Sequence, residues 1–105
     1  MDAQDLVLKK ERTRYAFLRK VFDTANGNEL TRVDFRRIAS ELGLSREELN
    51  DTILYLSGEH LIKIDSRKNV VITHDGIKEI EASIKEPSQS TLHFAAPVIQ
   101  VFTGP

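Results

Sequence analysis

Apolar residues follow helical spacing in the first part of the chain. Leu8, Tyr15 and Phe22 recur at every seventh position and Leu18 fills the same side, which predicts a first helix over residues 5–25. A second stripe at positions i, i+3, i+4 and i+7 predicts another helix, which opens at Thr31 as N-cap and ends at Gly43. This stripe consists of Phe35, Ile38, Ala39 and Leu42.

The clearest local signal comes directly after Gly43. Ser45 and Glu48 fit an S-x-x-E capping box, and Leu44 and Leu49 fit the hydrophobic staple around it. We therefore expect a third helix over residues 45–58, joined to the second helix by a tight turn. Its core-facing residues are expected to be Leu49, Thr52, Ile53 and Leu56.

The next segment has the pattern of a β-hairpin. Two β-branched or aliphatic runs, residues 61–65 and 70–73, flank a polar tip at residues 66–69. A short first strand is expected earlier in the chain, at residues 29–30. The chain should thus contain a small sheet whose hairpin follows the third helix.

A fourth helix is predicted to open at Thr73, with Asp75 in its first turn, where the helix dipole favours a carboxylate. It ends at Glu86, because a proline disfavours helical backbone in the residue before it. We expect one domain over residues 1–87 and a separate tail over residues 88–105. The core stripe of this helix is expected to be Ile77, Ile80 and Ile84.

The tail contains no Asp, Glu, Lys or Arg, and residues 98–102 resemble a strand. An unpaired strand of this composition is prone to edge pairing, so we expect Val98, Ile99 and Phe102 to pair with a second copy in a symmetric homodimer. An alternative is that the tail is a linker towards a further region of a longer protein.

The order helix, tight turn, helix, hairpin, helix over residues 31–86 resembles the winged-helix superfamily of bacterial regulators. The phrase Val71-Ile72-Thr73-His74-Asp75-Gly76-Ile77 is similar to its strand-to-helix junction. The resemblance implies a winged helix-turn-helix. With the flanking segments included, we expect an α+β winged helix-turn-helix fold with an N-terminal helix extension and a C-terminal strand-like tail. The resemblance also implies DNA binding, with the third helix in the major groove and the wing on the backbone. The implied contacts are Arg46, Asn50, Arg67 and Lys68.

Charge along the third helix points to another kind of partner. The chain has a net charge of −1, and Glu47 and Asp51 are expected on the outer side of this helix, where they would repel phosphates. Leu54 and Tyr55 beside them resemble a protein-contact patch. The alternative function is therefore a protein-interaction domain that uses Leu54, Tyr55 and the tail.

The first helix carries a basic stripe on the side opposite Leu18, formed by Lys9, Arg12, Arg19 and Lys20. It fits either an electrostatic contact with nucleic acid or an acidic partner, or an ordinary solvated helix face. Either interpretation leaves the expected fold unchanged.

The sequence gives little support for a metal-binding protein or an enzyme. The absence of cysteine excludes disulfides and thiolate metal sites, and His60, His74 and His93 lack the spacing of metal ligands. No nucleophile or nucleotide-binding motif is present, so we expect a non-enzymatic protein without cofactor. The sequence has neither the pattern of a signal peptide nor an apolar run long enough to span a membrane, so we expect a cytoplasmic location.

Overall fold

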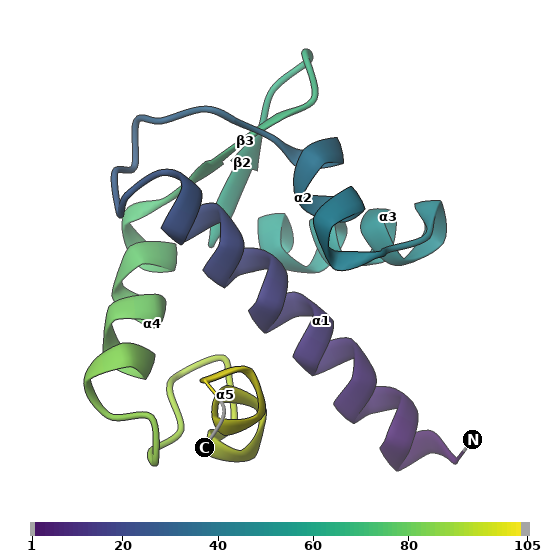
Figure 1. The fold of residues 1–105 in the computed structure, drawn as a ribbon, viewed down its shortest axis with the longest axis vertical. Coiled ribbons are helices and arrows are strands. Elements are labelled where there is room, and N and C mark those ends of the chain that lie inside the picture. The colour runs from purple at the N-terminus through teal and green to yellow at the C-terminus, as the bar shows by residue number, and fades with distance from the viewer. Residues whose placement is uncertain (1, 104–105) are drawn as a thin grey trace.

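The computed structural model describes residues 2–103, which form five helices and a three-stranded sheet (Figure 1). The elements are α1 (Ala3–Thr24), β1 (Val33–Asp34), α2 (Phe35–Leu42), α3 (Arg46–Gly58), β2 (Ile62–Ile64), β3 (Asn69–Ile72), α4 (His74–Lys85) and α5 (Ala96–Thr103). The expected α+β class is confirmed. Within the described range, no helix is both long enough and apolar enough to cross a membrane.

The sheet is antiparallel, with the strand order β1-β3-β2. Ile62 pairs with Ile72 and Ile64 with Val70, which confirms the predicted hairpin. Because alternate residues of a strand share a face, Ile62, Val70 and Ile72 all reach the core, where they are buried. The hairpin is therefore anchored by one apolar face, and its tip extends beyond the helices (Figure 1).

The predicted first strand at residues 29–30 is wrong. Leu30 is 84% exposed, and its N–H donates to the side-chain oxygen of Asn28 at 2.9 Å, which bends the chain. The strand lies later, at β1, where Val33 is buried and pairs with Val70. The strand thus forms where the side chain of Val33 can reach the core.

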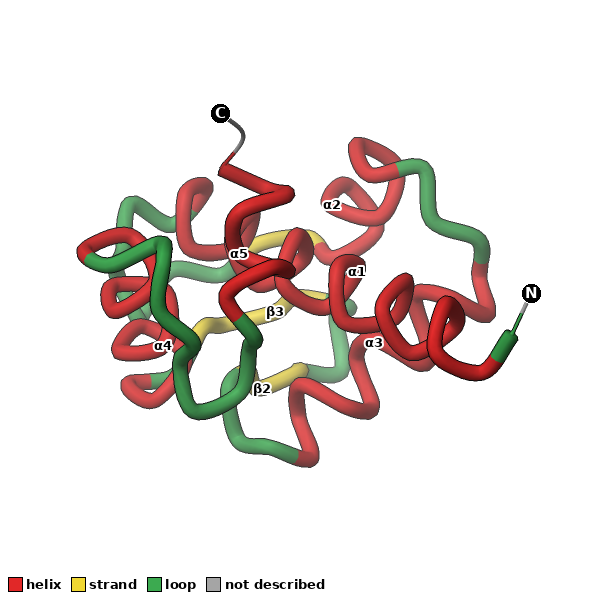
Figure 2. The backbone as a smooth tube through the Cα atoms, turned by 90° about the horizontal axis from the view of Figure 1, so that it is seen from below, coloured by secondary structure: helices red, strands yellow, loops and turns green. Residues whose placement is uncertain are grey.

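α1 passes through the middle of the molecule, with α2 and α3 on one side and α4 and α5 on the other (Figures 1 and 2). Tyr15, Phe17, Leu18 and Val21 are fully buried, because several elements cover this helix. The predicted core stripe of this helix omitted Phe17, which is buried. It also included Leu8, which is exposed. A helix in the middle of a domain buries more than one face.

The predicted start of the second helix is also wrong. Asp34, not Thr31, is the N-cap of α2, and its carboxylate accepts the backbone N–H of Arg36 at 2.9 Å. The end is as predicted, because Gly43 adopts the left-handed conformation with φ 67°. Ser45 then opens α3 with both hydrogen bonds of a capping box, which confirms the predicted turn.

α4 begins at the predicted cap, where the Thr73 hydroxyl accepts the Gly76 N–H at 3.1 Å. Ile80 is buried as expected, but Ile84 is exposed, so that part of the stripe is wrong. Ser83 takes the buried position instead and contacts the Tyr15 hydroxyl at 2.6 Å. A polar residue can face the core here because its hydroxyl finds partners there.

The predicted strand in the tail is wrong: residues 96–103 form a helix, α5. Phe94, Val98 and Ile99 are buried, and the rings of Phe94 and Phe102 lie edge-on to Tyr15, with centroids 5.1 and 5.5 Å away. A helix satisfies most of its own backbone groups, so residues 96–103 are not an open strand that could pair with a second copy. The tail covers α1 of its own chain (Figure 2).

Candidate functional site

α3 presents its outer side next to the hairpin. Leu56 and Thr52 are buried against the core, whereas Arg46, Glu47 and Asn50 are exposed. Leu54 is 72% exposed, so the predicted direction of its side chain is confirmed. The two candidate base-contacting residues of α3, Arg46 and Asn50, therefore lie on one accessible side of a helix whose start is fixed by its capping box.

The prediction that Asp51 lies on this outer side is wrong. The carboxylate of Asp51 faces α1, where it is 3.7 Å from Lys10 Nζ and 3.9 Å from Arg14 Nη2. Glu48 also faces α1, with Lys9 Nζ at 3.8 Å, and the pKa of Glu48 is held below its usual range chiefly by the N–H of Ser45. Two of the three acidic residues of α3 thus serve the contact between α3 and α1.

Tyr55 is not a free contact residue either. The guanidinium of Arg14 lies over its ring, 3.7 Å from the centroid, and the ring is only partly accessible. A cation above an aromatic face is attracted by the ring electrons. Tyr55 therefore belongs to the packing of α3 on α1, and Leu54 is left as the apolar side chain of the outer surface.

The hairpin tip is organised by Asp65. Its carboxylate accepts hydrogen bonds from the backbone N–H groups of Arg67 and Asn69 at 2.8 and 3.0 Å. These hydrogen bonds lower the pKa of Asp65, and the bond from Asn69 has the larger effect. Lys68 has a left-handed backbone with φ 64° and its carbonyl accepts the Phe35 N–H at 3.2 Å. The side chains of Arg67 and Lys68 remain exposed at the end of a turn whose backbone is held in place.

The unpaired charges of α3 and the hairpin are therefore mostly positive. In α3 and in residues 62–72, four lysine and arginine side chains form no ion pair. Among the carboxylates of these segments, Glu47 is the one that forms no ion pair. Lys63 was not among the predicted contact residues, although its position between Ile62 and Ile64 on a strand predicts an outward side chain. These four cations are Arg46, Lys63, Arg67 and Lys68.

The predicted basic stripe of α1 is divided among several partners. Lys9 faces Glu48, Lys20 Nζ is 2.7 Å from Glu41 of α2, and Arg19 Nε is 3.3 Å from Asp23. Arg12 is the one stripe residue without an ion pair in the described chain. Two residues of the stripe thus join α1 to its neighbours and a third pairs within α1, so the stripe is not an open basic surface.

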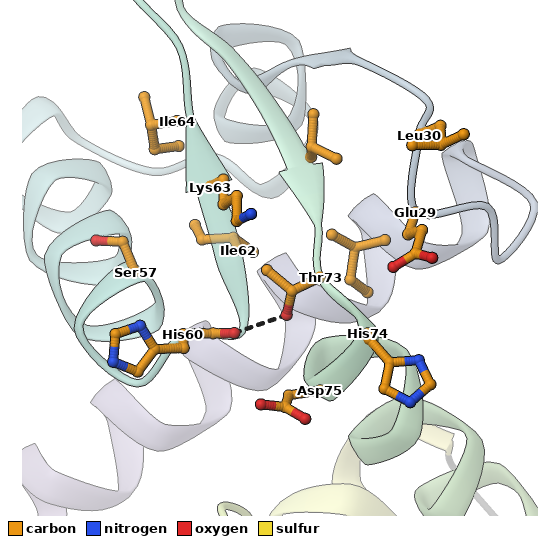
Figure 3. A pocket seen from close by; sticks show the side chains of 12 residues that line it. Glu29, Leu30, Ser57, His60, Ile62, Lys63, Ile64, Thr73, His74 and Asp75 are labelled. Carbon is orange, nitrogen blue, oxygen red and sulfur yellow. Dashed lines mark hydrogen bonds between the residues drawn. The ribbon is translucent and has the colours of Figure 1, made fainter.

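A groove of about 790 Å³ crosses the sheet between the end of α3 and the start of α4 (Figure 3). Its lining includes Ile64 and Lys63 of β2, and the imidazoles of His60 and His74 point away from each other. The Thr73 hydroxyl donates to the His60 carbonyl at 2.6 Å. Within residues 2–103 no group of His, Cys, Asp or Glu side chains is arranged to hold a metal ion.

A buried polar cluster fastens the tail and was missed in the sequence. His93 Nδ1 lies 3.0 Å from Glu79 Oε1, and His93 Nε2 lies 3.8 Å from Glu59 Oε2. Both His93 and Glu79 are largely shielded from solvent. The cluster joins the segment before α5 to α4 and to the end of α3. Its members are far apart in the sequence, so no local pattern could have revealed it.

Comparison with known proteins adds no constraint on the site. No protein-family model matches the chain, and no curated protein or solved structure matches it either. What α3 and the hairpin can bind therefore follows from their own shape, charge and exposure.

Proposed function

We propose that this chain is a winged helix-turn-helix domain that binds DNA through α3 and the hairpin. Three features support the fold assignment: the tight turn at Gly43 between α2 and α3, the strand order β1-β3-β2, and the hairpin that directly follows α3. In this fold the second helix of the pair enters the major groove and the wing lies on neighbouring backbone.

The observation that carries the proposal is the distribution of the acidic residues of α3. Glu48 and Asp51 are directed at Lys9, Lys10 and Arg14 of α1, and only Glu47 remains unpaired on the outer side. The outer side of α3 is therefore much less acidic than the sequence indicated, and acidity of this helix was the main reason to doubt DNA binding. An electropositive surface is what the phosphate backbone requires.

Five of the exposed side chains then have a role in DNA binding that fits their chemistry. Asn50 and Arg46 have the donors and acceptors that read base edges in the major groove, and Leu54 can contact a thymine methyl group. Arg67 and Lys68 at the hairpin tip reach phosphates, which position the protein without reading sequence. Binding of this type releases counterions and weakens with rising salt.

A second candidate function rests on Leu54. A leucine that is 72% exposed in the middle of an ordered helix also fits a protein-contact surface. In that case the partner would meet the outer side of α3 without contributing phosphates, and binding would depend on Leu54 more than on the hairpin cations.

Binding of random duplex DNA across a salt series tests the proposal. We expect Arg67→Ala combined with Lys68→Ala to weaken binding and to flatten the log–log salt slope by roughly two units, because two phosphate contacts are lost. The matched control is Lys78→Ala combined with Lys85→Ala, which removes two exposed lysines of α4, away from the hairpin (Figure 1).

The two functions give different results in this assay. If random duplex does not bind even at low salt, or if the α4 control weakens binding as much as the hairpin variant, the DNA proposal fails. A surface that binds protein through Leu54 would then remain as the function of α3.

A further inference from the structure

The first turns of α1 extend past the rest of the domain (Figure 1). They carry three consecutive apolar residues, Leu6, Val7 and Leu8, which are 45%, 52% and 37% exposed. Leu6 lines a hollow of about 350 Å³ beside α3. Leu8 is on the opposite side of the helix, because it lies two turns before Tyr15, the residue that α5 covers.

α5 also presents apolar side chains to solvent, two turns further along the side of α1 that contains Leu8. The Phe102 ring lies 5.5 Å from Tyr15 and is 39% exposed, and Val101 beside it is 58% exposed. Apolar side chains of both helices are therefore open to solvent on the side of α1 that is turned away from α3. Exposed apolar side chains gathered on one side of a domain are typical of a contact site.

Charged residues flank Leu8 in a self-complementary order. Asp5 and Arg12 are seven residues apart, so they lie on the same side of the helix, one before Leu8 and one after it. Both are exposed, and neither forms an ion pair with a described residue. Arg12 differs in this respect from the other cations of α1, which all have carboxylate partners: Lys9, Lys10, Arg14, Arg19 and Lys20.

We propose that α1 pairs with α1 of a second copy of this chain, antiparallel, about a two-fold axis close to Leu8. Such an axis places the Leu8 side chains against each other and brings Asp5 of each copy to Arg12 of the other, so one contact is made twice. Glu11, on the other flank of Leu8, then lies near the uncharged Gln4 of the second copy. No like charges meet across the interface.

The order of charges favours a second copy over an unrelated partner. A surface with one acid before and one base after an apolar centre matches itself when it is turned by a two-fold axis, whereas another protein would need the same order by coincidence. The apolar surface is short, so a weak dimer is expected. It lies opposite α3 on α1, which leaves α3 and the hairpin of both copies accessible.

Sedimentation velocity of the full chain over a concentration series tests the pairing. We expect the wild type to dimerise, and Asp5→Arg or Arg12→Glu alone to weaken association at least about tenfold, because each places like charges together twice. An equal mixture of these two variants should dimerise again, because every introduced charge then meets its opposite. High salt should reduce the differences among these proteins.

Controls separate this contact from general charge effects and from misfolding. Glu81→Arg and Lys78→Glu make the same charge changes on exposed positions of α4 and should leave the dimer intact. Leu8→Glu should abolish association and keep the helical circular dichroism. The proposal is overturned if the wild type stays monomeric at the highest attainable concentration, if Leu8→Glu still dimerises, or if the mixture associates no better than its components.

Discussion

Among single residues, Asp51 has the largest influence on how α3 is interpreted. Helical periodicity placed it on the outer side of α3, yet its carboxylate lies between Lys10 and Arg14 of α1. Arg14 also covers the ring of Tyr55. The local pattern specifies the direction of a side chain only to within a sector of the helix, and the neighbouring helix decides whether that sector meets solvent or protein.

Gly76 offers a test of packing at the scale of one residue. A methyl group at this position would lie 2.3 Å from the Leu61 carbonyl oxygen and 2.7 Å from Ile72 Cγ1, so backbone would have to move. We expect Gly76→Ala to lower the free energy of unfolding by about 1–3 kcal/mol in urea titrations.

Gly58 is the matched control for that change. An added Cβ there meets nothing within 4 Å, and the residue is helical, so Gly58→Ala should be neutral or should raise the free energy of unfolding by up to about 1 kcal/mol. Equal effects of the two substitutions would contradict the close approach of Leu61 to α4.

Among the elements, α5 shows how tertiary contacts override a local preference. Val98, Ile99 and Val101 are β-branched and favour strand locally. The segment forms a helix because helical spacing lets Val98, Ile99 and Phe102 reach the surface around Tyr15, where Phe94 also packs. Pro97 is tolerated because it stands in the first turn, where a backbone N–H has no helical partner.

Substitutions in α5 test this packing. Ile99→Ala removes a fully buried side chain and should lower the free energy of unfolding by about 2–5 kcal/mol. Val101→Ala, in the same helix, changes a largely exposed residue and should stay within about 0.5 kcal/mol of the wild type in the same denaturant titration. A strand or an unfolded tail would make the two substitutions similarly mild.

At the scale of the whole molecule, ion pairs connect α1 to its neighbours. Glu41 of α2 accepts a hydrogen bond from Lys20 of α1 at 2.7 Å and another from Arg37 at 3.0 Å. The hydrogen bond from Lys20 has the larger effect, and together the two partners hold the pKa of Glu41 below its usual 4.5. The pKa of Asp34 is also lowered, chiefly by its hydrogen bond with Arg36. The folded state therefore favours the ionised carboxylates.

This preference gives stability a defined dependence on pH. A carboxylate whose pKa is lower in the folded chain than in the unfolded chain contributes fully above the unfolded value, and the contribution is lost as pH falls through the folded value. We expect Glu41→Gln to be less stable than the wild type at neutral pH and the difference to shrink below about pH 4.5, measured by thermal melts across pH. A constant difference would show that the ion pairs do not contribute.

Local sequence patterns were sufficient to predict the features that depend on neighbouring residues. The capping box at Ser45, the left-handed Gly43, the hairpin around residues 66–69 and the cap at Thr73 are all local, since each joins residues close together in the chain. Their hydrogen bonds depend little on the rest of the fold, so short patterns predict them reliably.

Which surfaces remain free depends on contacts that form only in the folded chain. The position of β1, the helical tail, the cluster around His93 and the neutralised acids of α3 all depend on groups that are distant in sequence. Burial and charge pairing are properties of the assembled chain, because a side chain is desolvated or paired only by what packs against it. For that reason the elements of the candidate site could be predicted, whereas its charge could not.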